Sequence, residues 1–172
     1  MSASTVILAI TATTTSLIAG LFYAYSCSVN AGLSGLSDSA YIPAMQSINK
    51  AIINPLFFLS FMGTLLLLPV STYLHYGDPK SARFLLLLGA TTLYCIGSFG
   101  VTMFGNVPLN DALANFNVES ASSAEITLQR AKFEGPWNRL HTIRTIASIL
   151  SLVMVIVACL SETAVFEKEI AK

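Results

Sequence analysis

The residues of this chain best suited to chemistry lie close together near residue 140. Trp137, His141 and Arg144 follow one another at intervals of four and three residues, so an α-helix would carry them on one face. An imidazole exchanges a proton near neutral pH, and a guanidinium stabilises a developing oxyanion without losing its own proton. The indole adds an aromatic wall and one N–H donor. With Asn138 at the edge of the same face, the group predicts a proton-transfer site.

Each of these residues also has a structural interpretation. A tryptophan at a membrane boundary commonly anchors a helix at the interface, and an arginine there commonly extends towards the lipid head groups. A histidine or an asparagine also caps helix ends. For any one residue the structural interpretation is the stronger, whereas the convergence of all of them at one place favours a functional site.

The composition describes the elements that must hold this group. Of the 172 residues, 54% are apolar and only 10% are charged, against roughly 25% charged in an average globular domain. So few charges exclude an ordinary soluble domain and also intrinsic disorder. The formal net charge is zero, which excludes the basic surface of a nucleic-acid-binding protein. The chain is therefore expected to be an integral, multi-pass membrane protein with a lipid bilayer as its main partner.

Four apolar runs are each long enough to cross a bilayer as a helix. They cover residues 5–29, 52–76, 82–104 and 142–165. We expect an all-α protein with one domain over residues 1–172, a bundle of four transmembrane helices. A short amphipathic helix containing Tyr41 and Met45 should join the first two spans. A long, partly helical loop, broken at Gly135–Pro136, should join the last two.

Four crossings place both termini on one side of the membrane. The basic residues of that side lie in short segments close to the helix ends, which favours the cytoplasm; these are Lys80, Arg83, Lys168 and Lys172. Every helix brings polar residues to the opposite end. Besides Trp137, the predicted substrate-binding residues there are Tyr23, Asn30, Asn54, Asn106 and Asn110.

Small residues recur at every fourth position of the first span. They are Ala12, Ser16, Gly20, Ala24 and Ser28. Small side chains at this spacing let another helix approach closely, so we expect them to pack inside the bundle. The same stripe is compatible with association of two copies of the chain.

The sequence predicts no metal site. Cys27, Cys95 and Cys159 lie inside apolar runs and have the character of small hydrophobic residues. His75 and His141 belong to opposite ends of the bundle, roughly 30 Å apart, so one subunit could not hold a haem between them. A haem with His141 as its single axial ligand remains an alternative.

Four stretches resemble one known family. They are GLFYAYSCSVNAGL at 20–33, AYIPAMQSINKAIINPLFFLSFMG at 40–63, GNVPLNDAL at 105–113 and WNRLHTIRT at 137–145. Together they resemble the anthrone oxygenase family of small four-helix membrane proteins, long catalogued as a domain of unknown function. The resemblance implies oxidation of an anthrone, an apolar aromatic small molecule, to an anthraquinone. Molecular oxygen would be the co-substrate, with no metal or flavin.

The resemblance also implies roles for individual residues. His141 would act as the general base, and Arg144, with Asn138 or Asn110, would stabilise the enolate oxygen. Trp137 and Tyr23 would stack on the flat ring system. A related phenol or hydroquinone would suit the same chemistry.

Other classes of function stay open. The chain could be a non-enzymatic membrane scaffold, a small-lipid or quinone-binding protein, or a haem-binding redox protein. A scaffold would have polar groups at this end that satisfy one another by hydrogen bonds and leave no pocket.

Overall fold

The computed structural model describes residues 2–77 and 79–161, and every regular element within these ranges is helical. The chain is thus an all-helical protein with four candidate membrane-spanning stretches: Ala3–Ser34, Pro55–Leu74, Ala82–Ala114 and Ser123–Leu160. Their elements are α1 (Ala3–Ala24), η1 (Tyr25–Val29), α2 (Asn30–Ser34), α3 (Asp38–Ala51), α4 (Pro55–Leu74), α5 (Ala82–Thr92), η2 (Leu93–Gly100), η3 (Thr102–Asn106), α6 (Val107–Ala114) and α7 (Ser123–Leu160), where η marks π-helical turns.

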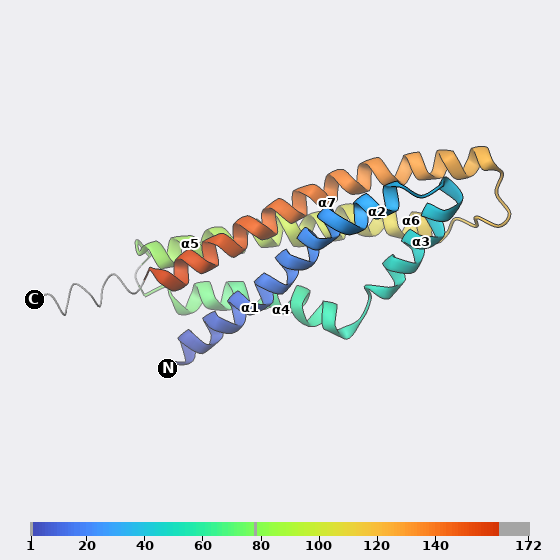
Figure 1. Cartoon of the computed structure of the whole chain (residues 1–172). Coiled ribbons are helices and arrows are strands. Elements are labelled where there is room, and N and C mark those ends of the chain that lie inside the picture. Colours follow the sequence, from blue (N-terminus) through green and yellow to red (C-terminus); the bar gives the residue numbers. More distant parts are fainter. Residues whose placement is uncertain (1, 78, 162–172) are drawn as a thin grey trace, which may run out of the picture.

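The unequal lengths of the helices determine the shape of the molecule. α4 has 20 residues, or about 30 Å, which matches the hydrocarbon core of a bilayer. α7 has 38 residues, or about 57 Å. The first, third and fourth stretches are longer than α4 and extend past its start. At the other end, α1 begins and α7 ends near the turn between α4 and α5 (Figure 1).

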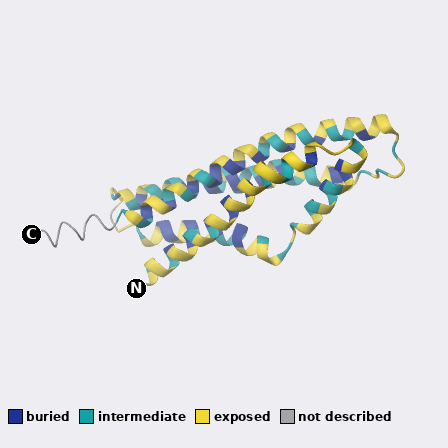
Figure 2. Ribbon diagram, viewed as in Figure 1, coloured by how far each residue is buried: buried dark blue, intermediate teal, exposed yellow. Residues whose placement is uncertain are grey.

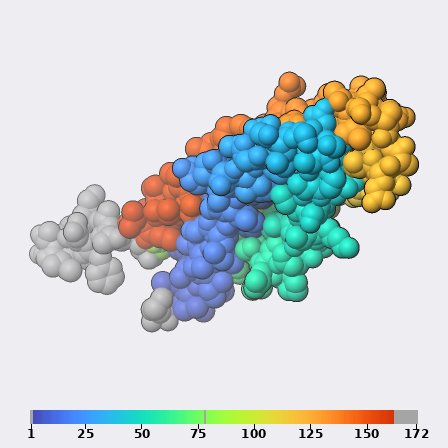
Figure 3. All heavy atoms as spheres, turned by 45° about the vertical axis from the view of Figure 1, so that its right-hand side comes forward, coloured from blue at the N-terminus to red at the C-terminus, as the bar shows by residue number. Residues whose placement is uncertain are grey.

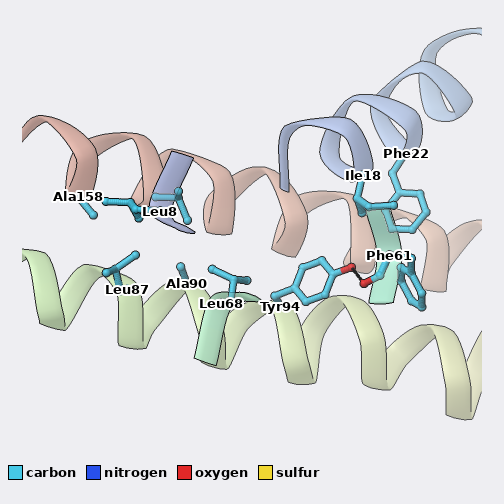
Figure 4. Packing of buried hydrophobic residues seen from close by; sticks show 10 residues of the cluster. Leu8, Ile18, Phe22, Phe61, Leu68, Leu87, Ala90, Tyr94 and Ala158 are labelled. Atoms are coloured by element: carbon cyan, nitrogen blue, oxygen red, sulfur yellow. Dashed lines mark hydrogen bonds between the residues drawn. The ribbon is translucent and has the colours of Figure 1, made fainter. Parts of the chain in front are cut away.

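The spanning part is built from α1, α4, α5 and α7. Its buried apolar side chains include Leu8, Ile18, Phe22, Phe61, Leu68, Leu87, Ala90, Tyr94, Val155 and Ala158 (Figure 4). The Tyr94 hydroxyl donates to the main-chain oxygen of Phe61 at 2.8 Å. Hydroxyl pairs also join helices, such as Ser148 and Ser98 at 2.9 Å. Such pairs stabilise helix packing where lipid supplies no hydrophobic driving force.

The outer surface of this part suits contact with lipid. Exposed residues follow the outward face of each helix (Figure 2), and many of them are large and apolar, including Leu56 at 80% and Phe104 at 87% exposure. In a soluble protein, so many exposed apolar side chains would promote association. In a bilayer, lipid can cover them.

The part beyond α4 has its own small core. α2, α3, α6 and the first half of α7 enclose Leu33, Tyr41, Ile42, Met45, Leu113, Ile126, Phe133 and Trp137. α2 and α3 lie over this end beside the start of α7 (Figure 3). Arg130 of α7 fastens them, because it donates to Asp38 at 3.0 Å and to the main-chain oxygen of Leu36 at 2.7 Å.

The predicted break at Gly135–Pro136 is wrong, because α7 runs through it without interruption. A proline inside a helix removes one hydrogen bond, here to the oxygen of Lys132. Pro136 and Lys132 are both exposed, whereas Phe133 and Trp137 on the same turns are buried. Packing on the buried face thus holds the helix across the proline. The predicted long loop is correspondingly short, since only residues 115–122 between α6 and α7 lie outside helices.

The predicted packing role of the small residues in α1 is wrong within one subunit. Ala12 is half-buried, and the other four face outward: Ser16, Gly20, Ala24 and Ser28. The buried face of α1 consists of Leu8, Thr11, Thr15, Ile18, Ala19 and Phe22. Larger side chains therefore make the contact with α4 and α7, and association of two copies through the small stripe stays a prediction.

The remaining expectations are tested less directly. A helix, α3, does lie between the first two spans, but its place at the membrane interface stays a prediction. Residues 162–165 of the fourth predicted span, together with Lys168 and Lys172, lie outside the described residues. The cytoplasmic location of the termini also stays a prediction.

Candidate functional site

The predicted face of α7 exists and is buried. Trp137, His141 and Arg144 are 3%, 1% and 8% exposed, respectively. The indole and imidazole rings stack, with centroids 5.0 Å apart and planes 13° apart. Arg144 donates from Nε to Nδ1 of His141 at 3.1 Å. By the rise per residue, His141 lies about 28 Å from the end of α7 at Leu160.

Aromatic rings from the first span close the other side of this face. The Tyr25 ring lies 5.1 Å from the His141 ring and 5.3 Å from the Trp137 ring. The guanidinium carbon of Arg144 lies 4.4 Å from the centre of the Phe22 ring and 5.1 Å from that of Trp137. The cation is therefore held between two π faces, an arrangement that is more favourable away from water.

Hydroxyl groups surround the imidazole and the guanidinium. Ser26 Oγ lies 3.0 Å from Nε2 of His141, and Thr145 Oγ1 lies 3.5 Å from the same nitrogen. Thr102 accepts a long hydrogen bond of 3.4 Å from Nη1 of Arg144. Both nitrogens of the imidazole thus have polar neighbours.

The third span contributes amides through η3 and α6. Asn106 donates to the main-chain oxygen of Trp137 at 3.3 Å, and Asn110 accepts from the indole Nε1 at 2.8 Å. Thr102 and Asn106 belong to π-turn η3, and Tyr25 and Ser26 belong to π-turn η1. π-helical turns occur frequently at functional sites. Here two of them supply the side chains that surround the α7 face.

Three buried amide atoms in the described residues have no hydrogen-bond partner. They are Nδ2 of Asn49, Oδ1 of Asn106 and Oδ1 of Asn138. Asn106 is fully buried, and its nitrogen is identified by the carbonyl that it faces, so its unpartnered atom is an acceptor. A buried unpartnered polar atom is costly and needs an explanation, such as a bound water or ligand.

Several predicted residues lie elsewhere. Tyr23 is 60% exposed and points away from the α7 face. Asn54 caps α4, because its Oδ1 accepts from the main-chain nitrogen of Phe57. Asn30 begins α2 and is half-buried. The structure thus brings Asn106, Asn110 and Trp137 together with His141 and leaves Tyr23 and Asn54 apart.

α1 and η1 reach the site through Phe22, Tyr25 and Ser26. None of the three is among the predicted site residues, although helical spacing carried a signal for them. Ile18 and Phe22 lie on the buried face, and steps of three and four residues from Phe22 give Tyr25 and Ser26. Tyr23 and Tyr25 lie on nearly opposite sides of a helix, so only one of them could face α7.

Two hollows lie on the surface near this end. An apolar groove of about 500 Å³ is lined by Cys95, Ile96, Gly100, Val101, Phe104, Gly105 and Leu140. A more polar hollow of about 370 Å³ lies by the 115–122 connection, against Glu125 and Lys132. Both are of the size of ligand sites, but neither is lined by Trp137, His141 or Arg144.

Within residues 2–77 and 79–161, no three His, Cys, Asp or Glu side chains come together in a group that could hold a metal ion. The His141 imidazole, which could ligate a metal ion, lies against the rings of Trp137 and Tyr25.

Comparison with known proteins gives one result. The family model described as anthrone oxygenase matches residues 57–154, which is more than half of the chain. No curated protein matched significantly, and no solved structure did so. The matched range includes all but the first two residues of α4, all of the third span and the α7 residues Trp137, His141 and Arg144. The chain belongs to the anthrone oxygenase family.

Proposed function

We propose that this protein is a membrane-embedded oxygenase that converts an anthrone, or a related phenol or hydroquinone, to a quinone with molecular oxygen. Family membership supports an oxygenase-like function. The observation that carries the proposal is the contact between His141 and Arg144, which are buried together between aromatic rings. A proton acceptor and a permanent cation that are buried together between flat aromatic rings suit a reaction that passes through an enolate.

The proposed oxygenation proceeds in a few steps. A base removes a proton from the carbon opposite the anthrone carbonyl, which gives an aromatic enolate. This carbanion bonds to one atom of O₂ and reduces it, and protonation gives a hydroperoxide. Loss of water then leaves the second carbonyl, so anthrone and O₂ become anthraquinone and water. O₂ is the oxidant, and the substrate supplies the electrons.

The residues of the site have distinct roles in this scheme. His141 is the proton acceptor, which contributes about 10²–10⁴-fold in rate. Arg144, with the amide of Asn138 or Asn110, stabilises the enolate oxygen, and an oriented donor of this kind contributes about 10²–10³-fold. Trp137 and Tyr25, rather than Tyr23, contact the flat face of the substrate. The unpartnered Oδ1 of Asn106 would accept from a hydroxyl of the ligand.

A membrane scaffold or small-lipid-binding protein is the second candidate. It is favoured by the hydrogen bonds that the polar groups make with each other, such as Trp137 to Asn110, and by the position of the two hollows. The unpartnered amides of Asn49, Asn106 and Asn138 favour a protein that binds a polar group over a scaffold that binds none.

A haem with His141 as its axial ligand fits the site poorly. Such a ligand needs a lone pair on a ring nitrogen, and the guanidinium of Arg144 points at Nδ1 while Ser26 lies against Nε2. Haem ligation would have to break one of these contacts.

Oxygen consumption tests the proposal. The protein, purified in detergent, is mixed with an anthrone in air, and oxygen uptake and quinone absorbance are followed above the rate of autoxidation. We expect His141→Ala to lose the rate above autoxidation by at least about 10²-fold. His75→Ala is the matched control at the far end of α4 and should keep this rate.

Three outcomes would contradict parts of the proposal. A wild-type rate equal to autoxidation would exclude the enzyme. Equal rates for wild type and a folded His141→Ala variant would remove His141 from the reaction. A Soret band in the absorption spectrum of the purified protein would favour the haem alternative.

A further inference from the structure

The two nitrogens of the His141 ring have different hydrogen-bond neighbours. Nδ1 lies 3.1 Å from Nε of Arg144. A guanidinium has donors and no acceptor, so Nδ1 must accept this bond with its lone pair. Nδ1 therefore carries no proton.

The hydroxyl groups on the other side agree with this assignment. Ser26 Oγ lies 3.0 Å from Nε2 of His141 and 3.0 Å from the main-chain oxygen of Phe22, and Thr145 Oγ1 donates to the main-chain oxygen of His141 at 2.7 Å. A hydroxyl that donates its one hydrogen to a main-chain oxygen can still accept from Nε2. A neutral imidazole without a proton on Nδ1 carries it on Nε2.

We propose that Arg144 is a positioning residue that holds His141 as the neutral tautomer protonated at Nε2, with the Nδ1 lone pair directed at the guanidinium. Ser26 and Thr145 complete the arrangement by accepting from Nε2. The ring is also fixed in rotation, because it stacks on Trp137 and lies against Tyr25. The charged or titratable groups that contact the ring are Arg144 and Tyr25.

This assignment has a consequence for the reaction, which rests on the proposed function. The only lone pair of the imidazole is at Nδ1, so Nδ1 is the atom that takes the proton from the substrate. The guanidinium has to leave Nδ1 first. Its other described hydrogen bond, to Thr102, is long at 3.4 Å and therefore holds it weakly. The carbonyl oxygen of the bound substrate would attract the guanidinium away, so the base would be exposed only when substrate is bound, and the guanidinium would then stabilise the enolate oxygen that forms.

Nitrogen-15 NMR tests the assignment without any turnover. The chain has two histidines, so His75→Ala labelled with ¹⁵N-histidine, in detergent micelles at neutral pH, reports on His141 alone. We expect one protonated and one unprotonated ring nitrogen. Two-bond couplings to the ring hydrogens should identify the protonated nitrogen as Nε2, since Nε2 couples to both carbon-bound hydrogens and Nδ1 mainly to one.

Variants in the same background test the part played by Arg144. Arg144→Met removes the donor, and the Nδ1 resonance should move to the position of a nitrogen free of hydrogen bonds. Arg144→Lys, which keeps a cationic donor, should restore most of the shift. Ser26→Ala should move the Nε2 resonance and leave that of Nδ1 in place.

Two results would overturn the assignment. One is a proton on Nδ1 in the His75→Ala protein, whether in the other tautomer or in the imidazolium ion. The other is an Nδ1 resonance that stays in place in a folded Arg144→Met variant. Either result can occur in an active oxygenase, and the expected result can occur in an inactive scaffold, so this test and the oxygen-consumption test fail separately.

Discussion

The indole of Trp137 donates from Nε1 to the side-chain oxygen of Asn110, 2.8 Å away. The two residues come from the separate motifs WNRLHTIRT and GNVPLNDAL. The contact fixes the plane of the indole against the imidazole of His141 and fastens α6 to α7. A ring that forms one wall of the candidate site is therefore held by a hydrogen bond and not by packing alone.

We predict that Trp137→Phe destabilises the protein by about 1–3 kcal/mol, because the acceptor of Asn110 loses its donor. Asn110→Leu should cost a similar amount, since the buried indole N–H is then unpartnered. The free energy of unfolding can be measured by titrating the micellar protein with SDS. In the double variant the two costs should not add, with a coupling energy of about 1 kcal/mol. Additive costs would show that the two side chains do not interact.

Two tyrosines that lie close in the sequence should differ in their effect on substrate binding. Tyr25 contacts the rings of His141 and Trp137, whereas Tyr23 is 60% exposed. Tyr25→Ala should raise the KM for an anthrone by about 2–10-fold, as expected for the loss of one aromatic contact of about 0.5–1.5 kcal/mol. Tyr25→Phe should keep most of the affinity, because the ring remains. A larger effect from Tyr23→Ala than from Tyr25→Ala would contradict the placement of the site.

The sequence was sufficient for the all-helical class, the presence of four long apolar helices and the α7 face. These follow from composition, run length and a helical period, which are local properties. Which side of α1 faces α7 is not a local property, so the sequence did not show that Tyr25 contacts the α7 face while Tyr23 is exposed. The π-turns η1 and η3 were also beyond prediction, because their hydrogen bonds span one residue more than those of the α-helix that the pattern assumes.

The failure at Gly135–Pro136 has a related cause. A proline was taken as a break because of its own backbone, whereas the outcome depends on what packs around it. Buried Phe133 and Trp137 hold α7 on both sides of Pro136. Likewise, the stripe from Ser16 to Ser28 has the right spacing for helix packing, but the pattern does not say whether the partner is in the same subunit.

Asn54 should act on stability and not on turnover. Its side chain accepts from the main-chain nitrogen of Phe57 at the start of α4, and loss of such a cap costs about 0.5–2 kcal/mol. Asn54→Ala should therefore lower the free energy of unfolding by this amount, and Asn54→Asp or Asn54→Ser should restore it. The rate of oxygenation per folded molecule should stay at the wild-type value. A folded Asn54→Ala variant that has lost turnover would return Asn54 to the site, as the sequence analysis expected.

The pair of Asp38 and Arg130 should make stability depend on acid pH. A hydrogen bond from Thr127 and then the bond from Arg130 hold the pKa of Asp38 below its ordinary value of 3.8. The unfolded chain therefore binds this proton more readily than the folded one, so acid favours unfolding. The contribution of Asp38 should be complete above about pH 5 and should disappear as the pH falls through the lowered pKa.

Asp38→Asn removes the charge and keeps the size of the side chain. The variant should melt at a lower temperature than wild type at pH 7, and the two melting temperatures should approach each other as the pH falls below about 4. Thermal unfolding of the micellar protein between pH 3 and pH 7 measures both quantities. Glu119→Gln, at an exposed position before α7, controls for the loss of one negative charge and should leave the pH dependence unchanged. Parallel curves for wild type and Asp38→Asn over the whole range would show that Arg130 holds α2 and α3 through the main-chain oxygens of Ser34 and Leu36 alone.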